Sequence, residues 1–382
     1  MKKIITFGCA AILSMTVLCA ACDKDNYPYK SPYFYSMGSD AAFVLPAQLT
    51  STRQGDCYKL YSETADLLLA LDLSLSATLE NSYITAFNNA GAGAKVEINE
   101  YAYGVFSSAL DLYEKTEGYY NPAVYYNVFA YGFGAALKLP ETADELPSDE
   151  VIEKYNTLAN SFADIVLSEE NGKYYARKPE TEVQIDGVNY SLKVDLGGIG
   201  KGYAVDKIDR LLDKHDINYG YFTFGASSIA FKQYIGENGG EFPLGLTNPR
   251  YVSGVSKNPI LVTSVKNERI STSGDNVQYY EIDGTRYCHV IDPTTGKPVQ
   301  TGVMTATVIG GSAAENDAFT TAIMAMGKDK AIEFIKTKLS NRRVFFTFDC
   351  AYDGGEGYEI YTNVPASEIT VLDSAFTLKE IV

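Results

Sequence analysis

The sequence contains no tryptophan, only two histidines, and fewer basic than acidic residues: 32 Lys and Arg against 48 Asp and Glu, for a formal net charge of −16. Nucleic-acid binding requires a basic face, so we expect no nucleic-acid partner. The overall negative field also repels other anions. An anionic ligand must therefore be held locally, by backbone dipoles, a few cations or a metal ion.

Cysteine is too scarce to build a disulfide framework. Three of the six cysteines lie within the first 22 residues, and only Cys57, Cys288 and Cys350 remain in the body of the chain. Their wide spacing matches no zinc-binding pattern. One disulfide could form among them, and the sequence does not indicate which pair would form it.

Long apolar runs are absent except at the N-terminus. Lys2 and Lys3 precede an apolar stretch over 4–18, and residues 19–22 read Cys-Ala-Ala-Cys. This pattern resembles a bacterial lipoprotein signal, with 1–21 as the signal peptide and Cys22 as the lipidated residue. An ordinary signal peptide followed by an unrelated cysteine is the alternative. We therefore expect an exported protein, lipid-anchored to the bacterial cell membrane and facing outside the cytoplasm.

The rest of the chain alternates helix and hairpin signals. Segment 22–36 is polar and tyrosine-rich and predicts a tether, and 37–382 predicts one large domain. Asn99 and Ser148 each precede a helical apolar pattern as N-caps. Asp-Gly pairs at 186–187 and 283–284 predict β-hairpins. Because strands and helices are interspersed, we expect an α+β fold with mixed or antiparallel sheets and packed helices.

The stretch 194–208 is the most informative part of the sequence. We expect an apolar strand, a turn over 197–202 that holds four glycines and Lys201, and then a helix. Glycine permits positive φ and close backbone approach, and the N-terminus of a helix attracts anions. The pattern predicts an anion site, with phosphate as the expected ligand. The alternative is a glycine-rich connection with a solvated lysine.

Two further stretches carry candidate chemistry. Asp317 and Thr321 share a face on an expected helix, and a carboxylate with a hydroxyl suits Mg²⁺; the same spacing is common on solvated helices. His289, on an expected strand before a turn, could be a general base. From the residues alone, a histidine of the core is the favoured interpretation, and His215 is predicted to lie on a surface loop.

Together these motifs resemble the ApbE-like FAD:protein FMN transferases. Residues 195–206 (DLGGIGKGYAVD) are similar to the family signature, with Gly200 where alanine is commoner. Residues 289–296 (HVIDPTTG) are similar to the family motif HIIDPxTG. Asp317 with Thr321 is similar to the start of its ADAxxT helix.

The opening Met37-Gly38-Ser39 also resembles the family's Met-Gly-Thr, and the resemblance covers 37–330. Three short segments depart from the family pattern. Residues 225–228 read Gly-Ala-Ser-Ser where Gly-Gly-Asp or Gly-Gly-Asn is usual, 76–78 lack an aromatic flavin contact, and 121–123 read Asn-Pro-Ala for Asp-Pro-Thr. These changes affect the flavin side of the site more than its metal and phosphate side.

The resemblance implies an ApbE-like fold with 37–382 as the catalytic domain. It implies Mg²⁺-dependent transfer of FMN from FAD to a Thr or Ser hydroxyl of an exported or membrane acceptor protein, with release of AMP. Alternatives are a Mg²⁺-dependent FAD pyrophosphatase that gives FMN and AMP, or a non-catalytic flavin-binding lipoprotein.

The resemblance also assigns roles to individual residues. Mg²⁺ would be held by Asp317, Thr321 and the backbone carbonyl of Gly198, and His289 would be the base for the attacking hydroxyl. The residues expected to contact FAD are Met37, Asn121, Asp195, Lys201 and Ile291.

Overall fold

The computed structural model describes residues 29–30, 33–134, 138–225, 227–235 and 240–382. The predicted signal peptide 1–21 and Cys22 lie outside the described residues. Within the described ranges, no helix combines the length and apolar character needed to cross a membrane.

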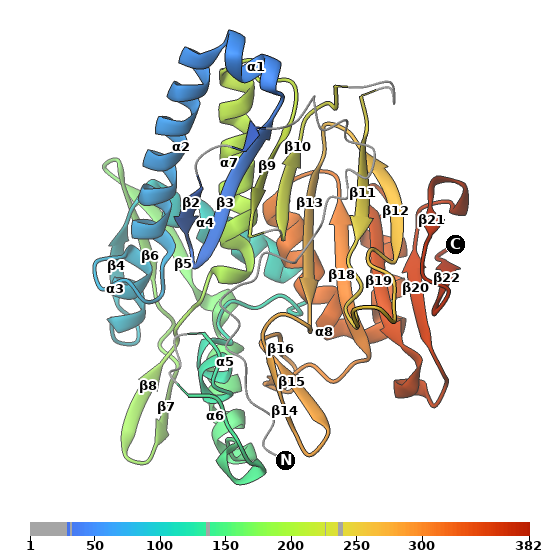
Figure 1. Ribbon diagram of the computed structural model, residues 1–382. Helices are drawn as coiled ribbons and strands as arrows, with labels where there is room; N and C mark the ends of the chain where they lie inside the picture. Colours follow the sequence, from blue (N-terminus) through green and yellow to red (C-terminus); the bar gives the residue numbers. More distant parts are fainter. Residues whose placement is uncertain (1–28, 31–32, 135–137, 226, 236–239) are drawn as a thin grey trace.

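A ten-stranded sheet runs through the middle of the molecule in the order β1-β3-β9-β10-β13-β18-β19-β20-β22, with β2 paired to β3 (Figure 1). Its neighbours are antiparallel except β20 and β22, which are parallel. The strands are β1 (Tyr29–Lys30), β2 (Phe34–Ser36), β3 (Ser39–Leu45), β9 (Tyr221–Phe224), β10 (Ser228–Phe231), β13 (Arg269–Gly274), β18 (Val303–Ile309), β19 (Arg343–Asp349), β20 (Tyr358–Thr362) and β22 (Phe376–Glu380).

Smaller sheets and hairpins surround this sheet. One three-stranded sheet comprises β11 (Phe242–Leu246), β12 (Leu261–Val265) and β21 (Thr370–Val371), and another comprises β4 (Lys95–Ile98), β5 (Val166–Glu170) and β6 (Lys173–Arg177). The hairpins are β7 (Glu182–Ile185) with β8 (Val188–Ser191), β14 (Tyr279–Ile282) with β15 (Thr285–Cys288), and β16 (Ile291–Asp292) with β17 (Lys297–Pro298).

The helices lie mainly on one side of the large sheet (Figure 1). The α-helices are α1 (Ala47–Thr52), α2 (Gln54–Leu75), α3 (Tyr83–Asn89), α4 (Glu100–Lys115), α5 (Tyr125–Ala130), α6 (Asp149–Ala159), α7 (Gly197–Lys214) and α8 (Ala313–Lys338). Short 3₁₀ turns are η1 (Ala143–Glu145), η2 (Phe162–Asp164), η3 (Cys350–Asp353) and η4 (Ala366–Glu368).

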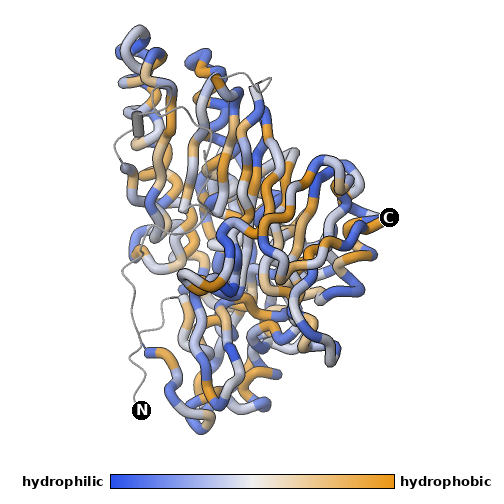
Figure 2. Tube along the Cα trace, turned by 45° about the vertical axis from the view of Figure 1, so that its right-hand side comes forward, coloured by the Kyte–Doolittle hydropathy of each residue, from blue (hydrophilic) through white to orange (hydrophobic). Residues whose placement is uncertain are grey.

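The large sheet has a different cover on each face. Helices α7 and α8 pack on one face, and the β11–β12–β21 sheet covers the other. Strand β10 shows how side-chain alternation produces these layers: Ser228 and Ala230 point toward the helices, whereas Ile229 and Phe231 join the core between the two sheets. Figure 2 shows hydrophobic residues concentrated along the strands in the middle of the molecule.

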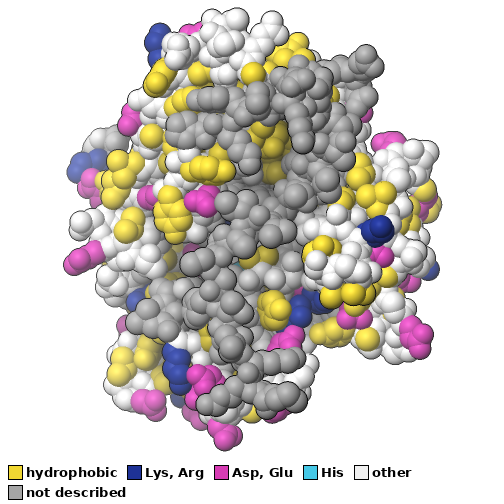
Figure 3. Space-filling model, viewed as in Figure 1, with side chains coloured by type: hydrophobic (Ala, Val, Ile, Leu, Met, Phe, Trp, Pro, Cys, Tyr) yellow, Lys and Arg dark blue, Asp and Glu magenta, His cyan; other side chains and the backbone are white. Residues whose placement is uncertain are grey.

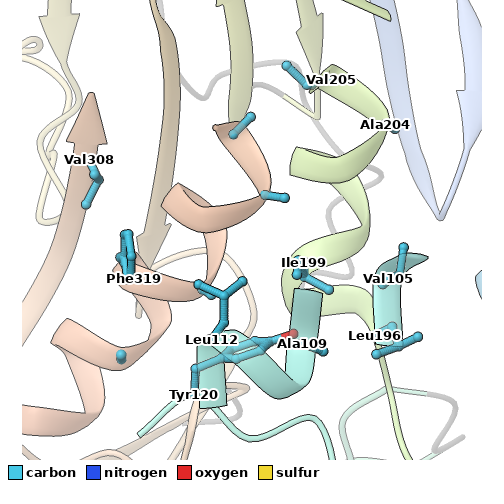
Figure 4. Packing of buried hydrophobic residues seen from close by; sticks show 14 of the residues in the cluster. Val105, Ala109, Leu112, Tyr120, Leu196, Ile199, Ala204, Val205, Val308 and Phe319 are labelled. Carbon is cyan, nitrogen blue, oxygen red and sulfur yellow. The ribbon is translucent and has the colours of Figure 1, made fainter. Parts of the chain in front are cut away.

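Helix α4 closes the helical layer where α7 begins. Its residues Val105, Ala109 and Leu112 pack in one buried cluster with Ile199 of α7 and Phe319 of α8 (Figure 4). These side chains exclude water from the junction, so the starts of α7 and α8 sit on a rigid apolar base.

Several local predictions are confirmed. The side chains of Asn99 and Ser148 cap α4 and α6, and the two Asp-Gly pairs form the turns of β7–β8 and β14–β15. The α+β class with mostly antiparallel sheets is confirmed. Cys57, Cys288 and Cys350 are all free, so no disulfide forms among them.

Other local predictions need correction. The apolar stretch 221–231, which reads as one buried strand in the sequence, forms two strands, β9 and β10, paired antiparallel. Part of the predicted tether belongs to the sheet, because β1 and β2 pair with β3. His215 caps the end of α7 and lies 3.2 Å from Glu63, so it is not a surface loop residue.

Candidate active site

The glycine-rich stretch is the beginning of a helix rather than a turn. Strand β8 ends at Ser191, and α7 starts at Gly197, so no strand precedes the glycines directly. Gly197, Gly198, Gly200 and Gly202 lie in α7, outside the positive-φ region. Glycine is a poor helix former, which is why the sequence pattern indicated a turn. The prediction was wrong because the need for glycine arises from tertiary packing, most clearly at Gly202, and not from turn geometry.

Gly202 allows α7 and α8 to touch backbone to backbone. A Cβ at this position would stand 2.2 Å from the carbonyl oxygen of Ala313 and 2.7 Å from the nitrogen of Ala314. The N–H of Gly202 donates to Oδ2 of Asp317 over 2.6 Å. At Gly202 the two helices are therefore in backbone contact, and the same residue bonds to the carboxylate predicted as a metal ligand.

The carboxylate of Asp317 is buried and has a donor on each oxygen. Besides Gly202, the hydroxyl of Ser228 on β10 donates to Oδ1 over 2.8 Å. Burial raises the pKa of Asp317, while the charge of Lys201 and the hydrogen bonds from Ser271, Ser228 and Gly202 act in the opposite direction. The carboxylate thus has a fixed orientation and an environment that favours a nearby positive charge.

Asp317, Thr321 and Gly198 provide oxygen atoms of the kind that Mg²⁺ prefers. The Thr321 hydroxyl donates to the carbonyl of Asp317 over 3.1 Å, which leaves its lone pairs free. In a regular helix the N–H of residue 202 donates to the carbonyl of residue 198, but here it donates to Asp317. The Gly202 N–H is the usual donor to the Gly198 carbonyl, and it is now wholly or partly engaged by Asp317. In both cases the Gly198 carbonyl oxygen keeps a lone pair for a cation.

The described residues hold no group of three or more His, Cys, Asp or Glu side chains that could bind a metal ion unaided. One carboxylate with a hydroxyl and a carbonyl leaves several coordination positions open. Mg²⁺ commonly fills such positions with water and substrate phosphate. The donor set therefore fits Mg²⁺ bound together with a phosphate-containing substrate.

Met37 occupies a strained turn above the start of α7. Met37 and Gly38 connect β2 to β3 with φ of 48° and 71°. The Met37 N–H donates to Asp72 over 2.9 Å, and its Sδ lies 3.4 Å from where a Cβ on Gly200 would stand. Positive φ at a residue other than glycine is costly and clusters at ligand sites, in agreement with a binding role for Met37.

Lys201 supplies the positive charge of the site. Its Cδ lies 3.6 Å from where a Cβ on Gly225 would stand. Within the part of the chain that the structure describes, Lys201 forms no ion pair. Its charge lowers the pKa of both Asp317 and His289, so the ammonium group lies near both.

Asp195 and Asn121 lie in neighbouring loops, and each side-chain Oδ1 accepts the backbone N–H two residues further along. The Asp195 N–H donates to Pro122 over 2.8 Å, and its Oδ1 accepts the N–H of Gly197 over 2.8 Å. The Asn121 amide donates to Ala159 over 3.0 Å, and its Oδ1 accepts the N–H of Ala123 over 2.9 Å. Asn121 therefore shapes its own loop, and its predicted contact with FAD stays a prediction.

His289 follows β15 and is half-buried, beside the ring of Phe133. Its Nδ1 lies 3.4 Å from the carbonyl oxygen of Gln278, so Nδ1 is the protonated nitrogen of the neutral ring and Nε2 has a free lone pair. Burial lowers the pKa of His289 to about 4, and the nearby charge of Lys201 adds to the effect. A neutral imidazole with one open nitrogen can accept a proton at neutral pH.

Ile291 packs in a small core below this histidine, with Tyr131, Phe133 and Tyr280. The turn that follows is fixed by Gly296, where a Cβ would collide with the side-chain amides of Asn127 and Asn156. The structure therefore shows Ile291 in a structural core, and its predicted FAD contact stays a prediction.

Comparison with known proteins decides the family. The model of the ApbE family matches residues 37–346. The chain belongs to the ApbE family. Its relatives include proteins named FAD:protein FMN transferase from Treponema pallidum, 28% identical over 283 residues with 72% of this chain and 73% of the relative covered, and from Escherichia coli K12, 26% identical with 87% and 90% covered.

Solved structures of the ApbE family share the fold. The flavin transferase ApbE of Vibrio cholerae superposes with a TM-score of 0.67 at 23% identity, covering 87% of this chain and 96% of that one. The ApbE protein of Thermotoga maritima superposes with a TM-score of 0.66 at 25% identity, covering 86% and 95%.

Three residues of this ApbE-family site could not be found from the sequence. Ser228 lies 89 residues from its partner Asp317. Asp206 caps α8 from the neighbouring helix by accepting bonds from Ser312, Ala313 and Ala314. Tyr120 packs against Gly198. No periodicity or local spacing connects these pairs, because each contact is tertiary.

Proposed function

We propose that this protein transfers FMN from FAD to a Thr or Ser hydroxyl of an acceptor protein and releases AMP. The observation that carries the proposal is the junction of α7 and α8, where Gly202 ties Asp317 to the helix of Gly198 and Lys201. This junction combines a fixed carboxylate, open oxygen ligands and an unpaired ammonium group. Such a combination suits the pyrophosphate of FAD despite the negative charge of the whole chain.

Mg²⁺ would be held by Asp317, Thr321 and the carbonyl of Gly198. When bound, it supplies electrostatic stabilisation of the charge that develops on the transferred phosphoryl group. Lys201 offsets further phosphate charge, and Met37 covers the adjacent start of α7.

His289 accepts the proton of the attacking hydroxyl at Nε2. The acceptor oxygen forms a bond to the FMN-side phosphorus, the bond from that phosphorus to the bridging oxygen breaks, and AMP leaves with the bonding pair. The Gln278 carbonyl holds the ring in the required tautomer. General-base assistance of this kind contributes roughly 10²–10⁴-fold in rate.

The lowered pKa of His289 gives a pH signature. A base works while it is neutral, so activity is retained above its pKa and lost as the pH falls through that value. We expect kcat/KM, which reports the free enzyme, to hold well below the ordinary histidine value of about 6.5 and to fall toward pH about 4. A profile with its inflection near 6.5 would show that His289 is not buried as described or is not the base.

A paired titration tests the roles of Lys201 and His289. FAD affinity is measured by flavin fluorescence, and transfer by covalent flavin label on exported candidate proteins after denaturing electrophoresis. Lys201→Ala should weaken affinity and transfer together, because its charge acts on bound FAD as well as on the transition state. His289→Ala should change affinity by only a few-fold and remove most of the transfer.

Three results count against the proposal. Equal losses of affinity and rate in His289→Ala would leave His289 as a structural residue. Free FMN and AMP without labelled protein would assign the site to hydrolysis. Bound FAD that survives Mg²⁺ unchanged, with no label, would indicate a flavin-binding protein without turnover.

The proposed location is outside the cytoplasm, on a lipid anchor at Cys22. The support is the residue pattern 19–22 after an apolar stretch. The acyl chains of a bacterial lipoprotein together give stable membrane attachment, whereas one chain binds only marginally. Cys22→Ser should move the protein from the membrane fraction to the soluble fraction, and an unchanged distribution would mean that another segment anchors the chain.

A further inference from the structure

Ser228 is a buried hydroxyl with one acidic partner. It is 0% exposed, and its Oγ lies 2.8 Å from Oδ1 of Asp317. Because a carboxylate without its proton accepts but cannot donate, the hydroxyl must be the donor in this pair. The other carboxylate oxygen accepts the N–H of Gly202. Donors from β10 and α7 therefore hold one carboxylate of α8 from two directions.

The strand register explains why this serine reaches the helix. Ser228 on β10 is paired with Ser271 on β13, and both side chains face α8. Ser271 donates to the backbone carbonyl of Ala313 over 3.2 Å. Thus the sheet holds α8 at its backbone through Ser271 and at its functional carboxylate through Ser228.

We propose that Ser228 is a positioning residue that fixes the orientation of Asp317 for Mg²⁺. This inference rests on the proposed function, since it assigns the metal to Asp317. Each carboxylate oxygen directs one lone pair to its hydrogen-bond donor. These two bonds fix the plane of the carboxylate, so the directions of the remaining lone pairs, which would bind the metal, are fixed as well. Without the Ser228 hydroxyl, the carboxylate would keep the Gly202 bond and the Ser271 hydroxyl, which also donates to the Ala313 carbonyl, and its orientation would be less restricted.

The magnitude follows from the behaviour of groups that orient metal ligands. Removal of such a partner typically weakens metal binding 10–100-fold. The loss differs from that caused by removing a ligand, because saturating metal restores the occupied site. The expected signature is therefore a higher metal requirement with little change in maximal turnover.

The test measures metal binding directly. The full chain in detergent is titrated with Mn²⁺ in the presence of FAD without acceptor, free Mn²⁺ is followed by electron paramagnetic resonance, and Mg²⁺ is then used to displace it. Ser228→Ala should raise the Mn²⁺ dissociation constant about 10–100-fold. FAD affinity in the absence of metal should stay within a few-fold of the wild type.

Two further variants separate positioning from packing. Thr307→Val removes another buried hydroxyl, from the Thr272–Thr307 pair on β13 and β18, and should leave Mn²⁺ affinity unchanged. Ser228→Cys keeps the volume of the side chain but is a weaker donor, so its Mn²⁺ affinity should lie between those of the wild type and Ser228→Ala. If Ser228→Ala does not fold, the Mn²⁺ affinities of Ser228→Cys and Thr307→Val are compared instead, and weaker binding by Ser228→Cys alone supports the positioning role.

The outcomes are distinguishable. Wild-type protein that binds no Mn²⁺ with FAD present would overturn the metal assignment in the proposed function and this inference with it. Wild-type binding with the same affinity in Ser228→Ala or Ser228→Cys would overturn the positioning role alone. Lower thermal stability of these variants with unchanged Mn²⁺ affinity would show that Ser228 serves only packing.

Discussion

The two ends of α7 use polar groups in different ways. At the start, Lys201 has no ion pair among the described residues, and the Gly198 carbonyl retains a lone pair for a ligand. Toward the other end, Asp209 pairs with both Lys232 and Arg269. At the start of α7 the Lys201 ammonium and the Gly198 carbonyl are thus available to a ligand, whereas further along the Asp209 carboxylate is engaged in ion pairs within the fold.

Asp206 marks the border between the two ends. Its carboxylate accepts hydrogen bonds from Ser312 and from the first N–H groups of α8 at 2.6–3.0 Å. This contact caps α8 one turn before Asp317 and holds it against α7. We call the start of α7 the open end and the part around Asp209 the closed end. Contacts at the closed end fix the geometry of the groups that the open end presents to a ligand.

The distribution of basic side chains on the surface also bears on how an anion could be held. On the face drawn in Figure 3, described Lys and Arg side chains occur singly or in small groups among acidic ones. This face shows no extended basic patch among the described residues, so favourable charge for an anion at the site comes from single groups such as Lys201.

The largest expected effect comes from removing the carboxylate at the open end. Asp317→Ala should lower turnover by about 10²–10³-fold or more, because a methyl group cannot replace an anionic ligand. The buried Ser228 hydroxyl and Gly202 N–H would lose their acceptor, at about 1–3 kcal/mol of unfolding free energy. Turnover close to the wild type at saturating Mg²⁺, with folding checked by circular dichroism, would contradict the metal assignment.

The next effect tests whether the two ends are mechanically linked. Gly202→Ala places a Cβ 2.2 Å from the Ala313 carbonyl, so α7 and α8 must separate, at about 1–3 kcal/mol or more. Activity should fall too, because Asp317 moves with α8. The matched control is Gly200→Ala, whose Cβ meets only Met37 at 3.4 Å.

Alanine in place of glycine favours a helix by up to about 1 kcal/mol, so Gly200→Ala should be neutral or stabilising. Thermal melts of both variants provide the measurement. Equal destabilisation by the two substitutions would contradict the prediction that the contact between Gly202 and Ala313 requires glycine.

A smaller effect is expected at the border residue. Asp206→Ala removes the carboxylate that accepts from Ser312 and from the first two N–H groups of α8, while the N-cap Ser312 stays in place. It should lower the unfolding free energy by about 0.5–2 kcal/mol, measured by denaturant titration. Asp213→Ala is the control, because that side chain is 62% exposed and its partner Lys232 also pairs with Asp209; its effect should be within about 0.5 kcal/mol. If Asp213→Ala lowers the unfolding free energy as much as Asp206→Ala, the hydrogen bonds from Asp206 to the start of α8 make no special contribution to stability.

Local signals predicted much of this fold, and tertiary contacts account for what they missed. Asn99, Ser148 and the Asp-Gly turns act within a few residues, so their roles were readable. The helix expected for Asp317 and Thr321 is α8, which breaks where Gly327 adopts φ 73° and continues as a second helical segment. The helical state of 197–202 was missed, because the close contact that Gly202 makes is with Ala313, more than 100 residues away. Asp317 and Thr321 were predicted as metal ligands from their spacing and from the family resemblance, and this assignment stays a prediction. The hydrogen bond between Ser228 and the Asp317 carboxylate is a contact that no spacing reveals.

The smallest expected effect concerns Tyr120, beside the open end. Its hydroxyl is buried and has no hydrogen-bond partner in the described part of the chain, and its ring lies 3.3 Å from where a Cβ on Gly198 would stand. Burial, together with the charges of Asp317 and Asp195, raises the pKa of this phenol, so it stays a donor. An unpaired buried hydroxyl costs roughly 1–3 kcal/mol, and Tyr120→Phe should therefore leave the melting temperature of the free protein unchanged or higher.

The same substitution should reduce the rise in melting temperature produced by FAD with Mg²⁺, because ligand binding stabilises the folded state in proportion to its affinity. A donor that bonds to the bound substrate would be missing from the variant. Melts with and without FAD and Mg²⁺ separate the two effects. An equal rise in both proteins would show that the hydroxyl does not meet the ligand. A lower melting temperature of the free variant would mean that a water already satisfies the hydroxyl, and the open end would then have one donor fewer to offer.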